Sequence, residues 1–157
     1  MLSGRNFWRL NMTDYQADDR QTMIFTAAAK NKSRLQELVN YAKVAGCRKL
    51  GIANCISVQN YAEKLKILLT EAGFEVFSVN CRQSGLNGAD VAPELRGPSC
   101  DPLFQAEYLN NCNTDLNIEV GLCLGHGLLF RKHSAAPVTT FLVKDFATRH
   151  KPVESLE

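Results

Sequence analysis

Residues 49–81, KLGIANCISVQNYAEKLKILLTEAGFEVFSVNC, indicate the fold more clearly than any other stretch of this chain. The run over 49–55 is short and apolar, as in a buried strand, and Ser57 follows it as a candidate helix cap. Apolar residues then recur at helical spacing until Gly73, and a second strand pattern covers residues 75–80. Strand, helix and strand within about thirty residues form a parallel crossover unit. We therefore predict a parallel sheet.

The flanking segments continue this alternation of helices and strands. Upstream, Thr13 with Gln16 and Ser33 with Gln36 form capping boxes, which predict helices over 13–30 and 33–46. Downstream, the pattern predicts helices over 101–109 and 125–134 and strands over 117–123 and 138–145. We expect an α/β fold, a three-layer α/β/α sandwich with a mainly parallel, flavodoxin-like or Rossmann-like sheet of about four strands in the order 2-1-3-4.

The length and the charge balance narrow the class of protein. A chain of 157 residues fits a single domain over 1–157. Within it, we expect residues 1–12 to form a loosely attached arm and residues 82–99 to form a long loop that could act as a lid. The 18 basic and 16 acidic residues predict neither nucleic-acid binding nor binding to an anionic membrane. No signal peptide or membrane span is indicated, so we expect a cytoplasmic protein.

Cysteine is the residue type that points to a site. Six cysteines in a cytosolic chain favour free thiols, metal ligands or redox chemistry over structural disulfides. Cys55, Cys81 and Cys123 fall at the ends of predicted strands, and Cys100 lies just before a predicted helix. Because the carboxyl ends of parallel strands meet at one edge of a sheet, we expect these cysteines to converge.

A metal site is the first interpretation of this group. Cys123 and His126 lie three residues apart at a strand-to-helix turn, and thiolate and neutral imidazole are the preferred ligands of zinc. Four sulfurs at one edge would equally suit an iron–sulfur cluster. We predict that zinc or an iron–sulfur cluster is the cofactor and a metal ion the partner, with a small molecule as a further partner in the strand-end crevice. The predicted metal ligands are Cys55, Cys81, Cys100, Cys123 and His126.

A metal-free thiol enzyme is the alternative that the same residues support. Cys123 or Cys100, activated at a helix N-terminus, would attack an electrophile while His126 moves protons. Lys144 and Asp145 end the last predicted strand, where they would orient or neutralise a substrate. The catalytic candidates are therefore Cys123, His126, Lys144 and Asp145.

Two further groups of residues carry weaker predictions. Gly121, Gly125 and Gly127 surround a strand-to-helix turn whose amides could face a phosphate, which makes nucleotide or phosphate binding a third alternative. Their spacing matches neither the dinucleotide fingerprint nor the P-loop. We interpret His133 and His150 as structural or solvent-facing residues.

Four motifs give the chain a resemblance to a known family. They are GFEVFSVNC at 73–81, CDPLFQAEYLN at 100–110, LNIEVGLCLGHGLLFRKHSAAPVTTFLVKD at 116–145 and RHKP at 149–152. Over about residues 34–155 the chain resembles the microbial family DUF1847, a domain of unknown function whose members are described as predicted metal-binding proteins. The resemblance implies a metal site. It places Cys55, Cys81, Cys100, Cys123 and His126 on the family's recurring cysteine and histidine positions, and Asn110, Lys144 and Asp145 on its other polar positions.

Overall fold

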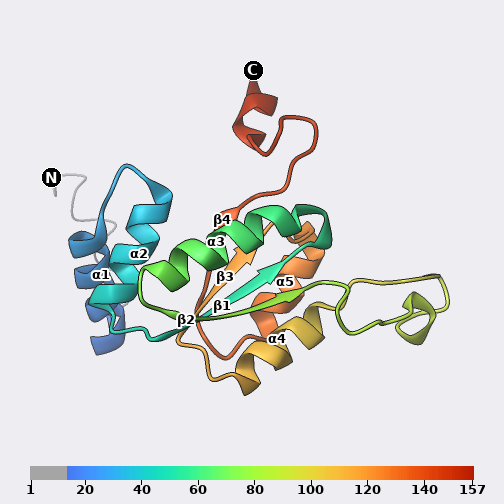
Figure 1. The fold of residues 1–157 in the computed structure, drawn as a ribbon, viewed down its shortest axis with the longest axis horizontal. Helices are drawn as coiled ribbons and strands as arrows, with labels where there is room; N and C mark the ends of the chain where they lie inside the picture. The colour runs from blue at the N-terminus through green and yellow to red at the C-terminus, as the bar shows by residue number, and fades with distance from the viewer. Residues whose placement is uncertain (1–13) are drawn as a thin grey trace, which may run out of the picture.

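The computed structural model describes residues 14–157, so the predicted arm and Thr13 lie outside the described part. Within that part, helices and strands alternate after a pair of N-terminal helices (Figure 1). In chain order they are α1 (Ala17–Ala29), α2 (Arg34–Val44), β1 (Lys49–Asn54), α3 (Gln59–Glu71), β2 (Glu75–Asn80), α4 (Pro102–Asn111), β3 (Leu116–Val120), α5 (Leu124–His133) and β4 (Val138–Leu142). Among the helices of this part, none combines the length and apolar character that crossing a membrane requires.

The sheet is parallel throughout and confirms the predicted fold class. Its strands lie in the order β2-β1-β3-β4, which is the predicted order. Helix α3 packs against β1 and β2, whereas α4 packs against α5 and also against β1 and β2. Figure 1 shows α3 on one side of the sheet and α4 with α5 on the other. The described residues therefore form the three layers of an α/β/α sandwich.

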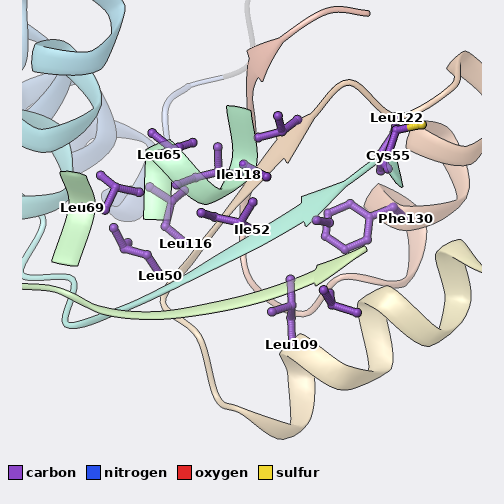
Figure 2. Close-up of a cluster of buried hydrophobic side chains, with 14 of the residues drawn as sticks. Leu50, Ile52, Cys55, Leu65, Leu69, Leu109, Leu116, Ile118, Leu122 and Phe130 are labelled. Atoms are coloured by element: carbon purple, nitrogen blue, oxygen red, sulfur yellow. The ribbon is translucent and has the colours of Figure 1, made fainter. Parts of the chain in front are cut away.

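The central strand β1 is buried on both faces. Leu50 and Ile52 are fully buried and lie with Leu65 and Leu69 of α3 in one cluster (Figure 2). The alternate residue, Gly51, faces the other layer. A Cβ at this position would lie only 2.8 Å from Cδ1 of Leu109 in α4. The absence of a side chain at Gly51 therefore allows α4 to pack directly on the sheet.

Two helix starts follow the predicted capping residues, and the start of α1 does not. Gln16, predicted as the partner of Thr13 in a capping box, is instead the N-cap of α1 and forms its capping box with Asp19. Ser33 accepts a hydrogen bond from the Gln36 backbone N–H at the start of α2, and Asp101 caps α4 with Pro102 inside its first turn. Local hydrogen bonding thus determines where these helices begin.

Other predicted boundaries were also wrong. β3 ends at Val120, and not at Cys123, because Gly121 turns the chain with a φ of 64°. Cys123 is instead the N-cap residue of α5. β4 ends at Leu142 rather than at Asp145. α3 begins at Gln59 after a 3₁₀ turn over Ile56–Val58, because the Ser57 hydroxyl contacts the Cys55 sulfur at 2.9 Å instead of capping the helix.

The long loop over residues 82–99 extends outward from the carboxyl edge of the sheet (Figure 1). It contains one short 3₁₀ turn, Gly88–Asp90, and an isolated antiparallel bridge between Asn87 and Pro98. The Ser99 backbone N–H donates to the Leu86 carbonyl at 2.8 Å. The loop is therefore narrow at its base, and its role as a lid stays a prediction.

Replacing Gly51 with alanine should destabilise the fold. The new Cβ would collide with Oδ1 of Asn117 and crowd Leu109, and overpacking of this kind costs about 1–3 kcal/mol in the free energy of unfolding. Gly125 is the matched control, because a Cβ there meets no atom within 4 Å. Gly125→Ala should leave stability unchanged or raise it by up to about 1 kcal/mol. Urea unfolding measures both effects, and equal midpoints for the two variants would contradict the packing argument.

Asp115 should make the stability of the fold depend on pH. Its Oδ2 accepts hydrogen bonds from the backbone N–H groups of Lys49 and Arg48, both at 2.8 Å, and these bonds lower the pKa of its carboxyl group. The stabilisation is therefore present above the unfolded-state pKa and is lost as pH falls through the lower folded-state value. At pH 7, Asp115→Asn should cost about 1 kcal/mol at this exposed position. The loss in free energy of unfolding caused by Asp115→Asn should become smaller in strong acid, where the Asp115 carboxylate of the wild type is protonated. A loss that does not change with pH would contradict the prediction.

Candidate thiol site

The carboxyl ends of β1 and β2 bring two cysteines side by side. The Cys55 backbone N–H donates to the Val120 carbonyl at 3.1 Å, and the Cys81 N–H donates to the Asn54 carbonyl at 2.9 Å. These bonds continue the parallel ladder one residue beyond the strands. Both side chains are buried, with exposed fractions of 6% for Cys55 and 2% for Cys81. The predicted convergence of these two residues follows directly from the sheet.

Cys100 joins this edge from the start of α4. Its Sγ donates to the Cys81 Sγ at 3.4 Å, and the Ile56 N–H donates to the same Cys81 sulfur at 3.3 Å. The pKa of the Cys81 thiol is raised to about 12, chiefly by burial and in part by the neighbouring Cys100. The hydrogen bond from the Ile56 N–H lowers this pKa, but its effect is smaller. The pKa of the exposed Arg82 is raised chiefly by its hydrogen bond to Cys100. Cys81 is therefore a protonated thiol at neutral pH, beside a half-buried partner.

Lys144 connects the other two cysteines. Its Nζ donates to the Cys123 Sγ at 3.1 Å and to the Cys55 Sγ at 3.2 Å. Burial lowers the pKa of Lys144, but the hydrogen bonds to Cys123 and Cys55 outweigh it and leave the pKa raised. Burial likewise opposes ionisation of Cys55, but hydrogen bonds from Ser57 and Lys144 outweigh it and lower the pKa. The lysine ammonium thus stabilises negative charge on the Cys55 sulfur.

The two remaining catalytic candidates differ in what they can do. His126 lies half-buried in the first turn of α5. Its pKa is lowered by burial and then by the charge of Lys144, so its ring is neutral at pH 7 and can accept a proton. The Asp145 carboxylate accepts the backbone N–H groups of Ala147 and Thr148 at 3.0 and 3.3 Å. Asp145 therefore shapes the turn that follows Lys144.

His150 is a residue of this region that the sequence prediction treated as structural or solvent-facing. Its Nδ1 accepts the Asp145 backbone N–H at 3.0 Å, which leaves the ring proton on Nε2 in the neutral form. The ring packs edge-on against Tyr61 and Phe146, with centroid distances of 5.8 and 5.4 Å. Arg149 and His150 both have positive φ, 54° and 68°, a costly conformation for residues other than glycine. The RHKP motif was the sequence signal for this turn.

A cavity of about 360 Å³ opens next to Cys123 and Lys144. Glu119, only 8% exposed, also lines this cavity and accepts hydrogen bonds of 2.6 and 2.9 Å from the Arg131 guanidinium. Gly127 makes room for this carboxylate, because a Cβ there would lie 2.5 Å from Oε1 of Glu119. Gly127 is therefore a packing residue beside a buried acid. The charge of this acid is balanced by Arg131, so it does not decide the phosphate alternative, which stays a prediction.

The predicted metal ligands do not assemble into one ligand set. Cys81 and Cys100 form one sulfur pair, and the Lys144 ammonium occupies the space between Cys55 and Cys123. Within residues 14–157, no group of three or more histidine, cysteine, aspartate or glutamate side chains is placed to hold a metal ion. The four sulfurs would fit a metal only after Lys144 moved away, so metal binding stays a prediction.

Asn110, the remaining polar position of the resemblance, lies away from the thiols. Its Nδ2 donates to the His133 carbonyl at 2.9 Å, and its Oδ1 accepts the Ala135 N–H at 2.8 Å. The side chain therefore fastens the end of α4 to the end of α5. This role is structural.

Comparison with known proteins gives a family but no established function. A family model described as "Protein of unknown function (DUF1847)" matches residues 6–141. An uncharacterized protein of Methanocaldococcus jannaschii is 43% identical over 124 residues, which cover 76% of this chain and 64% of that protein. The chain thus spans less than two thirds of the relative's length. No solved structure matches the chain significantly.

Removal of the Lys144 charge should raise the pKa of Cys55. The ammonium is one of the groups that favour its thiolate, so Lys144→Met should shift the titration of Cys55 to higher pH. The ¹³Cβ chemical shift of Cys55, followed against pH, measures this directly in a buried residue. Lys151→Met is the matched control, because Lys151 pairs instead with Glu154 in the exposed tail. Superimposable titrations of wild type and Lys144→Met would refute the assignment.

Proposed function

Because the chain belongs to the DUF1847 family, whose function is not established, we propose its function from its own geometry. The protein is a thiol-dependent enzyme in which Cys123 attacks an electrophilic small molecule. Lys144 supplies the positive charge beside the reacting sulfur, and His126 accepts or returns the proton. The thiolate is the nucleophilic form of cysteine. Lys144 would stabilise its negative charge, and His126 would take up the proton that the thiol loses.

One observation carries the proposal, which is the position of the Lys144 ammonium between two sulfurs. An ammonium 3.1 Å from Cys123 and 3.2 Å from Cys55 is a permanent cation where a thiolate would develop. Such electropositive surroundings distinguish reactive cysteines from inert buried ones. The raised pKa of Lys144, due to these two sulfurs despite its burial, keeps the cation present across the neutral range.

Access separates the two sulfurs that share this cation. Cys55 is buried, whereas Cys123 is exposed at the N-cap of α5. The N-terminal end of a helix adds partial positive charge on the same side as Lys144. Cys123 is therefore the residue that meets the substrate, and Cys55 helps to hold Lys144 in place.

The cavity beside Cys123 supports a small substrate. Its volume of about 360 Å³ lies at the lower end of the range for small-molecule pockets. Leu128 and Val143 line it as exposed apolar side chains. Glu119 and Arg131 also line it, and because they pair with each other they add little net charge to the cavity. A compact molecule with an apolar body and an electrophilic carbon or sulfur fits this combination.

Metal binding is the second candidate, and the Cys81–Cys100 contact favours it. Two sulfurs at 3.4 Å, with Cys55 adjacent at the same edge, are the donor type that zinc and iron–sulfur clusters use. The ligands would come from Cys55, Cys81, Cys100, Cys123 and His126. This candidate requires Lys144 to release Cys55 and Cys123, and for that reason we rank it second.

Labelling with iodoacetamide at neutral pH, read by peptide mass spectrometry, tests the proposal. Cys123 should be alkylated first, and Lys144→Met should slow that reaction by about tenfold because the neighbouring cation is lost. Lys151→Met should label at the wild-type rate. Slow and uniform labelling of all cysteines, or no effect of Lys144→Met, would refute the reactive-thiol role.

Elemental analysis of the same protein, purified without oxygen, decides between the two candidates. Protein free of metal, with a fast Cys123, agrees with thiol chemistry. Stoichiometric zinc or iron that is lost in Cys123→Ser would instead assign these residues to a metal site and would displace the first proposal.

A further inference from the structure

Cys81 and Cys100 form a thiol pair that the chemistry at Cys123 does not use. Their sulfurs lie 3.4 Å apart, and a disulfide bond is about 2.05 Å long. To form the bond, the two sulfurs would have to come about 1.4 Å closer, which small rotations of the two side chains can supply. The pair is therefore placed to form a disulfide without any rearrangement of the sheet.

The backbone holds the two residues together independently of their sulfurs. The Asp101 N–H donates to the Cys81 carbonyl at 2.8 Å, and the Ser84 hydroxyl donates to Oδ2 of Asp101 at 2.7 Å. Cys81 follows β2 directly, and Cys100 precedes α4 directly. Two regular elements and a hydrogen-bonded loop base thus fix the geometry of the pair in its reduced form.

The two sulfurs are unequal in ways that suit thiol–disulfide exchange. Cys100 is half-buried and has the exposed Arg82 guanidinium beside it, so it can meet a disulfide from solvent. Cys81 is buried and receives the Ile56 N–H on its sulfur. An accessible attacking thiol backed by a protected resolving thiol is the arrangement that completes exchange within one molecule.

We propose that Cys81 and Cys100 are a redox-active dithiol that reduces low-molecular-weight disulfides. Cys100 attacks one sulfur of R–S–S–R, whose bond breaks as a mixed disulfide forms and the first R–SH leaves. Cys81 then attacks the Cys100 sulfur, the mixed disulfide breaks, and the second R–SH leaves. The protein loses two protons and two electrons and gains the Cys81–Cys100 bond. The small disulfide takes up both protons and both electrons as two thiols.

This inference goes beyond the proposed function and does not depend on it. The dithiol uses neither Cys123 nor Lys144, so loss of the reactive thiol at Cys123 leaves exchange at Cys81 and Cys100 intact. The two proposals can therefore fail separately.

The test uses the full chain, kept reduced under argon and then exposed to oxidised glutathione at neutral pH. Free thiols are blocked with N-ethylmaleimide, and peptide mass spectrometry maps the linkages. In wild type, the thiols of Cys81 and Cys100 should be lost together and the Cys81–Cys100 linkage should form, which dithiothreitol reverses. Cys81→Ser should retain glutathione on Cys100, because the resolving thiol is gone. Cys100→Ser should carry at least about tenfold less glutathione on the buried Cys81.

Two matched variants serve as controls. Cys112→Ser removes a half-buried cysteine elsewhere in the fold, and Cys123→Ser removes the thiol of the proposed function. Both should form the Cys81–Cys100 linkage at the wild-type rate. Disulfides within the protein that are scattered over other cysteine pairs would overturn the proposal, as would Cys81 and Cys100 thiols that stay reduced in folded wild type. Protection of both thiols until a chelator is added would also overturn it, by assigning the pair to a metal. The wild-type map needs no variant, so the test stands even if Cys81→Ser fails to fold.

Discussion

The parallel pairing of β1 with β2 on one side and β3 on the other is the constraint on which the rest of the molecule depends. Because all three strands run the same way, their carboxyl ends meet at one edge. The ladder then extends one residue further, through the N–H groups of Cys55 and Cys81. A shift of register by one residue would turn these side chains to the other face. The spacing of the thiols is therefore a property of the sheet.

Buried polar side chains near the same edge lower the stability of the fold. Nε2 of Gln105 donates to the carbonyls of Asn54 and Val79 at 3.1 and 3.0 Å, and Nδ2 of Asn54 donates to Gln59 at 2.7 Å. Oδ1 of Asn54 and Oε1 of Gln105 have no hydrogen-bond partner among the described residues. An unsatisfied buried acceptor costs about 1–3 kcal/mol. Violations of this kind concentrate at functional sites, where local stability is secondary to the placement of reacting groups.

The sequence predicted the sheet, its strand order and the starts of α2 and α4 because those features depend on local patterns, such as the run from Lys49 to Asn80. It misplaced Cys123, because the positive φ of Gly121 ends β3 early. Local patterns identified Lys144 as a catalytic candidate but not its contact with Cys55, which lies 89 positions away in sequence and accepts a hydrogen bond from the Lys144 ammonium. Convergence at the edge was predictable, but the division into one pair around Lys144 and another at Cys81 and Cys100 required side-chain positions. Metal binding by these residues stays a prediction.

The narrow base of the loop over residues 82–99 has a consequence for how this fold can vary. The Gly88 N–H donates to the Gly97 carbonyl at 2.8 Å, so the chain is already closed well outside the thiol pair. Doubling the length of the segment between these two residues would cost only about 0.6 kcal/mol in loop-closure entropy. The tip can therefore lengthen, shorten or change composition while Cys81 and Cys100 keep their distance. The two thiols are thereby insulated from changes in the outer part of the loop.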